Sequence, residues 1–242
     1  MKFKLAHEVK FFETDPALRL KLGSLVKLLQ EAAISHSGAV GQGARKVQET
    51  GFAWVLHKLG IDILRCPEYG ERLEIVTWST GVKGLKARRE FRVSSGSETA
   101  IAASSLWFYI DAARKQVVRI PPEIITPYGS ESETALQRDL DNWKADRDFI
   151  PEMEALITTR FSDYDPLEHV NNSVYFDYLE TAIFRRFNRA ARLKSVDMFF
   201  AREIPREIET ISTGFKTAGV SNSFKIWNSA QIYACGDFIL DG

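Results

Sequence analysis

The chain has 242 residues, 45% of them hydrophobic and 26% charged, which is the balance of a globular protein. Its 32 basic residues match its 32 acidic ones, so no net charge favours nucleic acid or an anionic membrane as a partner. No apolar run approaches the ~20 residues that cross a bilayer, and no signal-peptide core is visible, so we expect a cytoplasmic protein. Cys66 and Cys235 form no metal-ligand spacing and no disulfide framework, so neither a metal nor another cofactor is predicted.

The first half predicts a strand, a long helix and then several strands. Residues 2–11 alternate polar and apolar side chains, as a half-buried strand does. From Leu25 to His36, apolar residues recur every three or four positions, which predicts one buried helix face. Residues 52–120 are rich in β-branched and aromatic residues between turn signals, and they predict antiparallel strands.

The second half repeats this order after a segment rich in proline and charge, which predicts a linker over 126–150 with a short surface helix. A strand, the break at Asp165-Pro166, a helical stripe and further strands follow. An offset of 150 residues superimposes identical residue types at four positions of the two halves, and this supports an internal duplication. These positions are Asp15 and Asp165, Pro16 and Pro166, Leu29 and Leu179, and Ala32 and Ala182.

One long helix with an apolar face and a mostly antiparallel sheet must bury each other in each half. The physical solution is a sheet curled around the helix, which is the hotdog arrangement. We therefore predict an α+β protein with two hotdogs in tandem. The N-terminal hotdog covers residues 1–125 and the C-terminal hotdog covers residues 151–242.

The segment FSDYDPLEHVNNSVYFDYLETA, residues 161–182, carries the clearest chemistry. It places Asp165 and His169 just before a helix for which Asn171 or Asn172 is a good N-cap. The free N–H groups of a first helical turn can hold an oxyanion, and a histidine beside a carboxylate supplies acid–base chemistry near neutral pH. This combination suits transfer of an acyl group to water. No serine lies in a nucleophile elbow and no cysteine lies nearby, so an acyl-enzyme is not indicated.

The pattern DxDxxxHVNNxxYxxxxxE, from Asp163 to Glu180, resembles the signature of the second hotdog of the acyl-ACP thioesterases, which are double hotdog proteins. The similarity covers most of the chain. RLKLGSLVKLLQEAA resembles the family's first central helix, and MFFAREIPREIETIS resembles the segment that carries its catalytic glutamate. The resemblance implies a thioesterase of fatty acid biosynthesis that hydrolyses fatty acyl-ACP to free fatty acid and carrier thiol.

By position, the resemblance implies that Asp165, His169 and Glu203 are catalytic. It further implies that Glu203 or Asp165 activates water and that His169 orients the reacting group or protonates the leaving thiolate. The thioester carbonyl would be polarised at the helix N-terminus, which is formed by Val170, Asn171 and Asn172.

Two positions depart from the family pattern. Leu167 replaces an asparagine two residues before the histidine, and Ile204 replaces a cysteine after the glutamate, which argues against a thiol nucleophile. In the first half, Arg19 occupies the position of His169, so this half is expected to be catalytically silent and to house the acyl chain.

Each candidate catalytic residue could instead have a purely structural role. His169 could cap or pack, Asp165 could be a turn residue, and Glu203 could belong to a solvated ion-pair face. Glu180 matches a helix carboxylate that functions in some single hotdog enzymes, although a polar flank is the simpler interpretation. A basic cluster could face an acidic carrier protein or the phosphates of CoA, or could be an ordinary strand face; its members are Lys86, Arg88, Arg89 and Arg92.

Two alternative functions are kept. The first is an acyl-CoA thioesterase. The second is a non-catalytic acyl-binding hotdog protein, motivated by Leu167. The expected partner is acylated acyl carrier protein or acyl-CoA, and both a monomer and a homodimer are left open.

Overall fold

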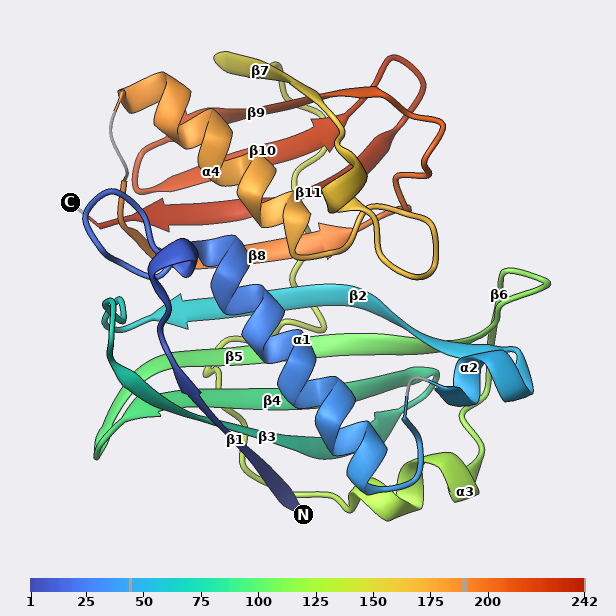
Figure 1. Cartoon of the computed structure of the whole chain (residues 1–242). Helices are drawn as coiled ribbons and strands as arrows, with labels where there is room; N and C mark the ends of the chain where they lie inside the picture. Colours follow the sequence, from blue (N-terminus) through green and yellow to red (C-terminus); the bar gives the residue numbers. More distant parts are fainter. Residues whose placement is uncertain (44, 189–190, 242) are drawn as a thin grey trace.

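Two long helices, α1 (Leu22–Ala39) and α4 (Val174–Phe187), lie on the same face of one antiparallel sheet in the computed structural model (Figure 1). The structure describes residues 1–43, 45–188 and 191–241. Helix α1 packs on the strands of the first half and α4 on those of the second. The predicted α+β class, with one long helix and an antiparallel sheet in each half, is confirmed.

The sheet runs in the order β1-β3-β4-β5-β2-β8-β11-β10-β9-β7, with β6 paired to β5. The first half contributes β1 (Lys2–Glu8), β2 (Phe52–Ile63), β3 (Arg72–Lys83), β4 (Lys86–Ser95), β5 (Glu98–Asp111) and β6 (Gln116–Val118). The second half contributes β7 (Met153–Thr158), β8 (Leu193–Phe200), β9 (Thr210–Ala218), β10 (Ser221–Trp227) and β11 (Ile232–Leu240). Strands β2 and β8 pair from Lys58↔Phe199 to Asp62↔Ser195, and this pairing is the seam between the halves.

The apolar stripes that predicted the helices are buried against the sheet. In α1, Leu25 and Leu29 are each only 2% exposed, and in α4, Leu179 and Ala182 are fully buried. Removing such apolar surface from water contributes about 25 cal/mol per Å². The spacing of the stripe therefore fixes which face of each helix meets the sheet.

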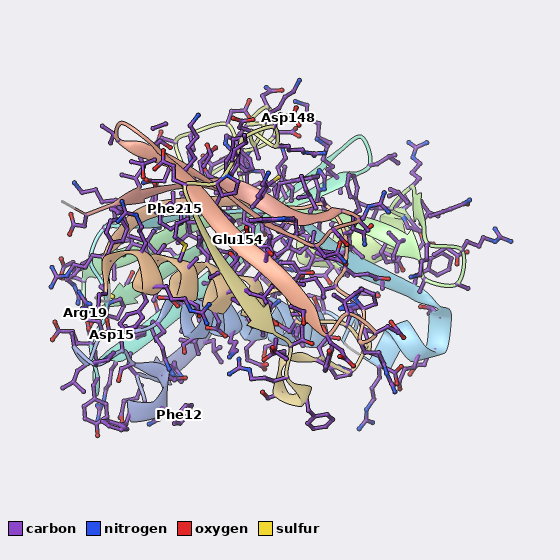
Figure 2. All side chains as sticks on the ribbon, turned by 90° about the horizontal axis from the view of Figure 1, so that it is seen from above. Phe12, Asp15, Arg19, Asp148, Glu154 and Phe215 are labelled. Carbon is purple, nitrogen blue, oxygen red and sulfur yellow. The ribbon has the colours of Figure 1, made fainter. Side chains whose placement is uncertain are left out.

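The chain between the halves crosses the face of the sheet opposite the helices, where Figure 2 labels Asp148. Its short helices, α3 (Pro122–Ile125) and η2 (Thr126–Tyr128), precede the charged stretch, and residues 129–152 contain no helix. Tertiary contacts hold these residues in a non-helical conformation. The buried Lys58 ammonium donates to three carbonyls of this stretch, those of Leu140, Asp141 and Trp143, at 2.6 to 3.1 Å. Arg138 also bridges the seam, because it pairs with Asp62 on β2 and with Asp197 on β8.

The internal repeat is visible atom by atom in the loops before the two long helices. Each loop begins with one turn of 3-10 helix, η1 (Phe11–Glu13) or η3 (Phe161–Asp163). The Asp15 N–H then donates to the Arg19 carbonyl at 2.8 Å, and the Asp165 N–H donates to the His169 carbonyl at 3.0 Å. The two loops lie at opposite edges of the seam (Figure 1).

The described residues were also compared with what a membrane-spanning helix and a metal site require. Among the helices of the described residues, none has both the length and the apolar character of a membrane span. Residues 1–43, 45–188 and 191–241 also hold no group of three or more potential metal ligands.

Candidate active site

The loop that precedes α4 brings Asp165 and His169 together. An Asp165 side-chain oxygen, Oδ1, accepts the N–H of Leu167 at 2.8 Å, and Glu168 adopts a left-handed backbone (φ 63°) that closes the turn. The imidazole Nδ1 of His169 then lies 3.7 Å from Oδ1 of Asp165. The two side chains are 23% and 16% exposed, so solvent reaches both. Asp165 therefore shapes the turn and is also the nearest carboxylate to His169.

A second aspartate, Asp163, anchors this loop to α4. Its side chain is almost fully buried and accepts the backbone N–H of Arg160 at 3.0 Å and the hydroxyl of Tyr178 at 2.8 Å. Burial, followed by this hydrogen bond, raises the pKa of the Tyr178 hydroxyl, which therefore stays protonated. Asp163 thus has a structural role beside the candidate site.

Helix α4 begins at Val174, a little later than an N-cap at Asn171 or Asn172 would give, and Ser173 is at the N-cap position. The Asn171 side chain still acts as an acceptor, because its Oδ1 binds the Ser173 N–H at 2.9 Å. The N–H groups of Val170 and Asn171 already donate to carbonyls, those of Ile204 and Asp163, at 2.9 Å each.

Asn172 differs from these two neighbours. Its backbone N–H donates to no acceptor within the described parts of the chain. Of the three residues predicted to hold an oxyanion, Asn172 alone therefore has a main-chain donor that is free for a ligand.

Glu203 follows β8, and its backbone is held beside the His169 loop. His169 forms an isolated β-bridge with Pro205. The buried Tyr175 hydroxyl accepts the Ile204 N–H at 3.0 Å and donates to the Arg202 carbonyl at 3.3 Å, so it clamps the main chain on both sides of Glu203. Burial raises the pKa of Tyr175, which keeps its proton available for this donation.

The Glu203 carboxylate itself is bound to a cation from the other half of the chain. The Nζ atom of Lys115 lies 2.5 Å from Oε1 of Glu203, and both side chains are exposed. Lys115 stands in the turn between β5 and β6 with a left-handed backbone (φ 51°). The structure thus brings Asp165 and His169 together and places the Glu203 carboxylate in an ion pair with Lys115.

Sequence reasoning missed Lys115 and Tyr175. Lys115 lies 88 residues from Glu203, and no local pattern links the two. Tyr175 is part of the HVNNxxY motif, but it also fits the apolar stripe of α4, which conceals the use of its hydroxyl. Glu180 is not a polar flank: its carboxylate accepts the N–H groups of Leu22 and Gly23 at the start of α1, at 3.0 and 3.4 Å.

The basic cluster on β4 makes its contacts within the fold, and three of its four members pair with acids. Lys86 binds Asp141, Arg88 pairs with Glu90, and Arg92 pairs with Glu133. Arg89 bonds His36 and Thr77 and lies over the Tyr128 ring. The cluster is therefore an internally paired strand face rather than a free basic surface.

A small cavity of about 10 Å³ lies under α1 in the first half. Its walls include Val26, Leu29 and Gln30 of α1, together with Leu56 of β2 and Trp107 of β5. At the offset of 150 residues, Gln30 corresponds to Glu180, which touches the start of the opposite long helix.

Comparison with known proteins agrees with this arrangement. The sequence profile of the acyl-ACP thioesterase N-terminal domain matches residues 1–128, and that of the acyl-ACP thioesterase C-terminal domain matches residues 150–235. A palmitoyl-acyl carrier protein thioesterase of Arabidopsis thaliana is 27% identical over 218 residues, covering 85% of this chain and 53% of the relative. An acyl-[acyl-carrier-protein] hydrolase of Cuphea viscosissima is 24% identical over 220 residues, covering 86% and 53%. The chain thus spans about half the length of the curated relatives it matches.

Solved structures share the fold over nearly the whole chain. An acyl-ACP thioesterase from Bacteroides thetaiotaomicron superimposes with a TM-score of 0.86 at 20% identity and covers 99% of this chain and 98% of its own. The 12:0-ACP thioesterase from Umbellularia californica also gives 0.86, at 18% identity and with coverage of 99% and 97%. Because the two domain profiles together cover most of the sequence, the chain belongs to the acyl-ACP thioesterase family.

Proposed function

We propose that this protein hydrolyses fatty acyl-ACP thioesters to free fatty acid and carrier thiol, as a step of fatty acid biosynthesis. The observation that carries the proposal is the pairing of His169 with Asp165, 3.7 Å apart, three residues before Asn172, whose backbone N–H has no acceptor within the described residues. A base, a carboxylate and an oxyanion donor are the groups that addition of water to an acyl carbon requires. The family membership supports a thioester as the source of the acyl group.

In the proposed mechanism, the thioester carbonyl oxygen accepts the Asn172 N–H. Asp165 or Glu203 takes a proton from water as its oxygen bonds to the carbonyl carbon, and a tetrahedral oxyanion forms. When this oxyanion collapses, the carbon–sulfur bond breaks, and His169 passes the proton that the carboxylate took from water to the departing thiolate, so that the carboxylate and the imidazole return to their starting states. Tyr175 contributes indirectly, because it fixes the backbone on both sides of Glu203.

The acyl chain is proposed to enter the first half beneath α1, where the small cavity beside Gln30 lies. A volume of about 10 Å³ holds one water-sized probe and no alkyl chain. Apolar side chains such as Leu29 and Trp107 must therefore move apart when substrate binds. Because the described chain contains both halves of the seam, we propose that a single chain completes the site and that dimerisation is not needed for turnover.

The test is hydrolysis of a purified acyl-ACP by the wild type and by the variants His169→Ala, Asp165→Asn and Glu203→Ala. Loss of a positioned acid–base group costs 10²–10⁴-fold, so we expect His169→Ala to lose at least about a hundredfold in kcat/KM. Lys46→Ala is the matched control, because its exposed ion pair with Glu49 lies on α2 (Arg45–Thr50), outside the site. Equal rates in all variants would overturn the assignment.

Two alternatives are decided by the same assay. An acyl-CoA thioesterase would release thiol faster from acyl-CoA than from acyl-ACP of the same chain length. A non-catalytic acyl-binding protein, which the exposed Leu167 in place of an amide favours, would show no turnover with either thioester and would retain acyl chains after purification.

A further inference from the structure

A cavity of about 250 Å³ lies at the edge of the seam opposite the candidate active site. Its lining residues include the start of α1, the end of β2 and the start of β8, and these three element ends lie at the same side of the molecule in Figure 1. Its buried walls are apolar and come from Leu20, Leu22, Leu25, Ile101 and Leu193.

The internal repeat makes this cavity the counterpart of the candidate active site. Asp15 and Arg19 correspond to Asp165 and His169 at an offset of 150 residues. Figure 2 shows Asp15 and Arg19 next to each other at one end of the molecule. All four residues belong to loops with the same backbone hydrogen bonds.

Cys66 is the counterpart of Glu203 in the first half. The Leu20 N–H donates to the Pro67 carbonyl at 2.8 Å, as the Val170 N–H donates to the Ile204 carbonyl at 2.9 Å. The residue before each acceptor is therefore equivalent in the two halves, and in the first half this residue is Cys66.

The groups needed for hydrolysis are absent or occupied here. The Arg19 guanidinium binds Asp15 through Nε and Nη2, at 3.0 and 2.7 Å, so no imidazole is present to move a proton. Burial raises the pKa of the Cys66 thiol to about 11, so it is a neutral thiol near pH 7. The N–H groups of Leu22 and Gly23, which would hold an oxyanion, already bind Glu180. The cavity therefore has the form of a binding site but lacks the groups that hydrolysis requires.

The interior of the cavity suits an alkyl chain. Asp15 and Arg19 neutralise each other, the thiol of Cys66 is uncharged, and the Glu180 carboxylate is bound to the helix start. At roughly 30 Å³ for each water-sized group, the volume holds a chain of about eight carbons. Each methylene that covers the apolar part of the wall removes apolar surface from water, which is favourable.

The rim of the cavity offers a cation for an anionic head group. Arg192 is exposed and forms no ion pair with any residue in the described parts of the chain. Of the other charges at the rim, Arg65 pairs with Glu71 and Asp241 pairs with Lys194, whereas Glu68 forms no ion pair with any residue that the structure describes. A guanidinium presents a planar fork of donors that matches a carboxylate, and this geometry favours Arg192 as the contact for such a head group.

We propose that this cavity is a second, non-catalytic binding site for a fatty acid, with the alkyl chain against Leu22, Leu25 and Ile101 and the carboxylate at Arg192. Only the choice of a fatty acid as the occupant rests on the proposed function, whose product it is. The geometry of the cavity is independent of turnover.

Cys66 provides a direct reporter of occupancy. It is half-buried and lines the cavity, whereas Cys235 is fully buried and serves as an internal control. The experiment measures alkylation of Cys66 by N-ethylmaleimide, followed by peptide mass spectrometry, in the presence of octanoate, octylamine or octanol. We expect saturating octanoate to slow the alkylation of Cys66 at least tenfold and octylamine to have little effect.

Three variants locate the site. His169→Ala should keep the protection of Cys66 by octanoate, which separates this cavity from the candidate active site and makes the result independent of hydrolysis. Arg192→Glu should raise the octanoate concentration needed for protection at least tenfold. Lys46→Glu, a charge reversal on α2, should leave the protection unchanged.

The proposal is overturned if octanoate does not protect Cys66, or if octylamine or octanol protects it as well as octanoate does. It is also overturned if Arg192→Glu is protected like the wild type, or if His169→Ala abolishes protection. Failure of acyl-ACP hydrolysis, by contrast, would remove the proposed function and leave the protection result unaffected.

Discussion

Lys115, in the turn between β5 and β6, lies with its ammonium 2.5 Å from the carboxylate of Glu203, which follows β8 in the other half of the chain. Hydrogen bonding to this carboxylate, followed by its charge, raises the pKa of Lys115, so the ammonium stays protonated at neutral pH. The candidate site is thus built from both halves, although Asp165, His169 and Glu203 all come from the second.

Lys115→Ala should lower kcat/KM for acyl-ACP by about twofold to fivefold. The pair is exposed to solvent, and exposed ion pairs contribute only ~0–1 kcal/mol. The effect should also be screened, so that 0.5 M salt brings the wild type close to the variant. Steady-state kinetics at low and high salt measure this difference, with Lys46→Ala as the control. A hundredfold loss, or a loss that persists in salt, would show that Lys115 acts directly on the substrate.

Leu167→Asn tests whether the missing amide limits the rate. The Leu167 side chain is 54% exposed in the turn that Asp165 shapes, so the substitution removes little buried apolar surface. One added hydrogen bond to water or substrate contributes ~1 kcal/mol, so we expect kcat/KM to rise by about fivefold. Ala17→Asn is the matched control, because Ala17 is exposed at the equivalent position of the turn before α1, where its N–H donates to Asp15 at 2.8 Å as that of Leu167 donates to Asp165. If neither variant alters the rate, the enzyme positions water without this amide.

The fold could be predicted from the sequence because it depends on local periodicity. The stripe that contains Leu29 and its counterpart with Leu179 determined the two helices, and the offset of 150 residues revealed the duplication. The approach of His169 to Asp165 was also predictable, since the two lie four residues apart in one tight turn.

The features that the sequence did not predict depend on contacts between residues far apart in the chain, which no local pattern encodes. Glu180 lies 158 residues from Leu22, yet it accepts the Leu22 N–H. The predicted oxyanion donors depended on where α4 begins. Because Val170 donates to Ile204 across the loop, the predicted set of three is reduced to Asn172. Helix boundaries and long-range pairs are decided by tertiary packing rather than by propensity.

Tyr175→Phe should lower both stability and activity. The variant keeps the ring but loses the hydroxyl that binds the backbone at Ile204 and Arg202, and it leaves the buried Ile204 N–H without an acceptor. An unsatisfied buried donor costs ~1–3 kcal/mol, which urea unfolding can measure. Because the clamp also positions Glu203, kcat should fall more than KM changes. Tyr128→Phe is the matched control: its buried hydroxyl binds Ser37 in the first half, so it should destabilise the protein without the specific loss of kcat.

Glu180→Gln should change how stability depends on pH. Burial, followed by repulsion from Asp177, raises the pKa of Glu180 to about 7 from 4.5. Between these values the folded chain binds more protons than the unfolded chain at this group, so its contribution to the free energy of unfolding falls as pH rises from 4.5 to 7. The change across this window is on the order of 3 kcal/mol. The glutamine cannot ionise, so the variant should lose this decrease.

The difference between the two proteins is the informative quantity, because other buried groups titrate in the same window. Burial lowers the pKa of His36 and of His57 to about 4, so both histidines favour the opposite trend, with stability lost as pH falls from 6.5 to 4. Both proteins share this contribution, and it cancels when their unfolding free energies are subtracted at each pH. Urea unfolding from pH 4.5 to 8 should therefore show the wild type losing stability relative to the glutamine variant as pH rises. A pH-independent difference would mean that Glu180 ionises at its ordinary pKa in the folded protein, and that the start of α1 holds it as a fixed anion.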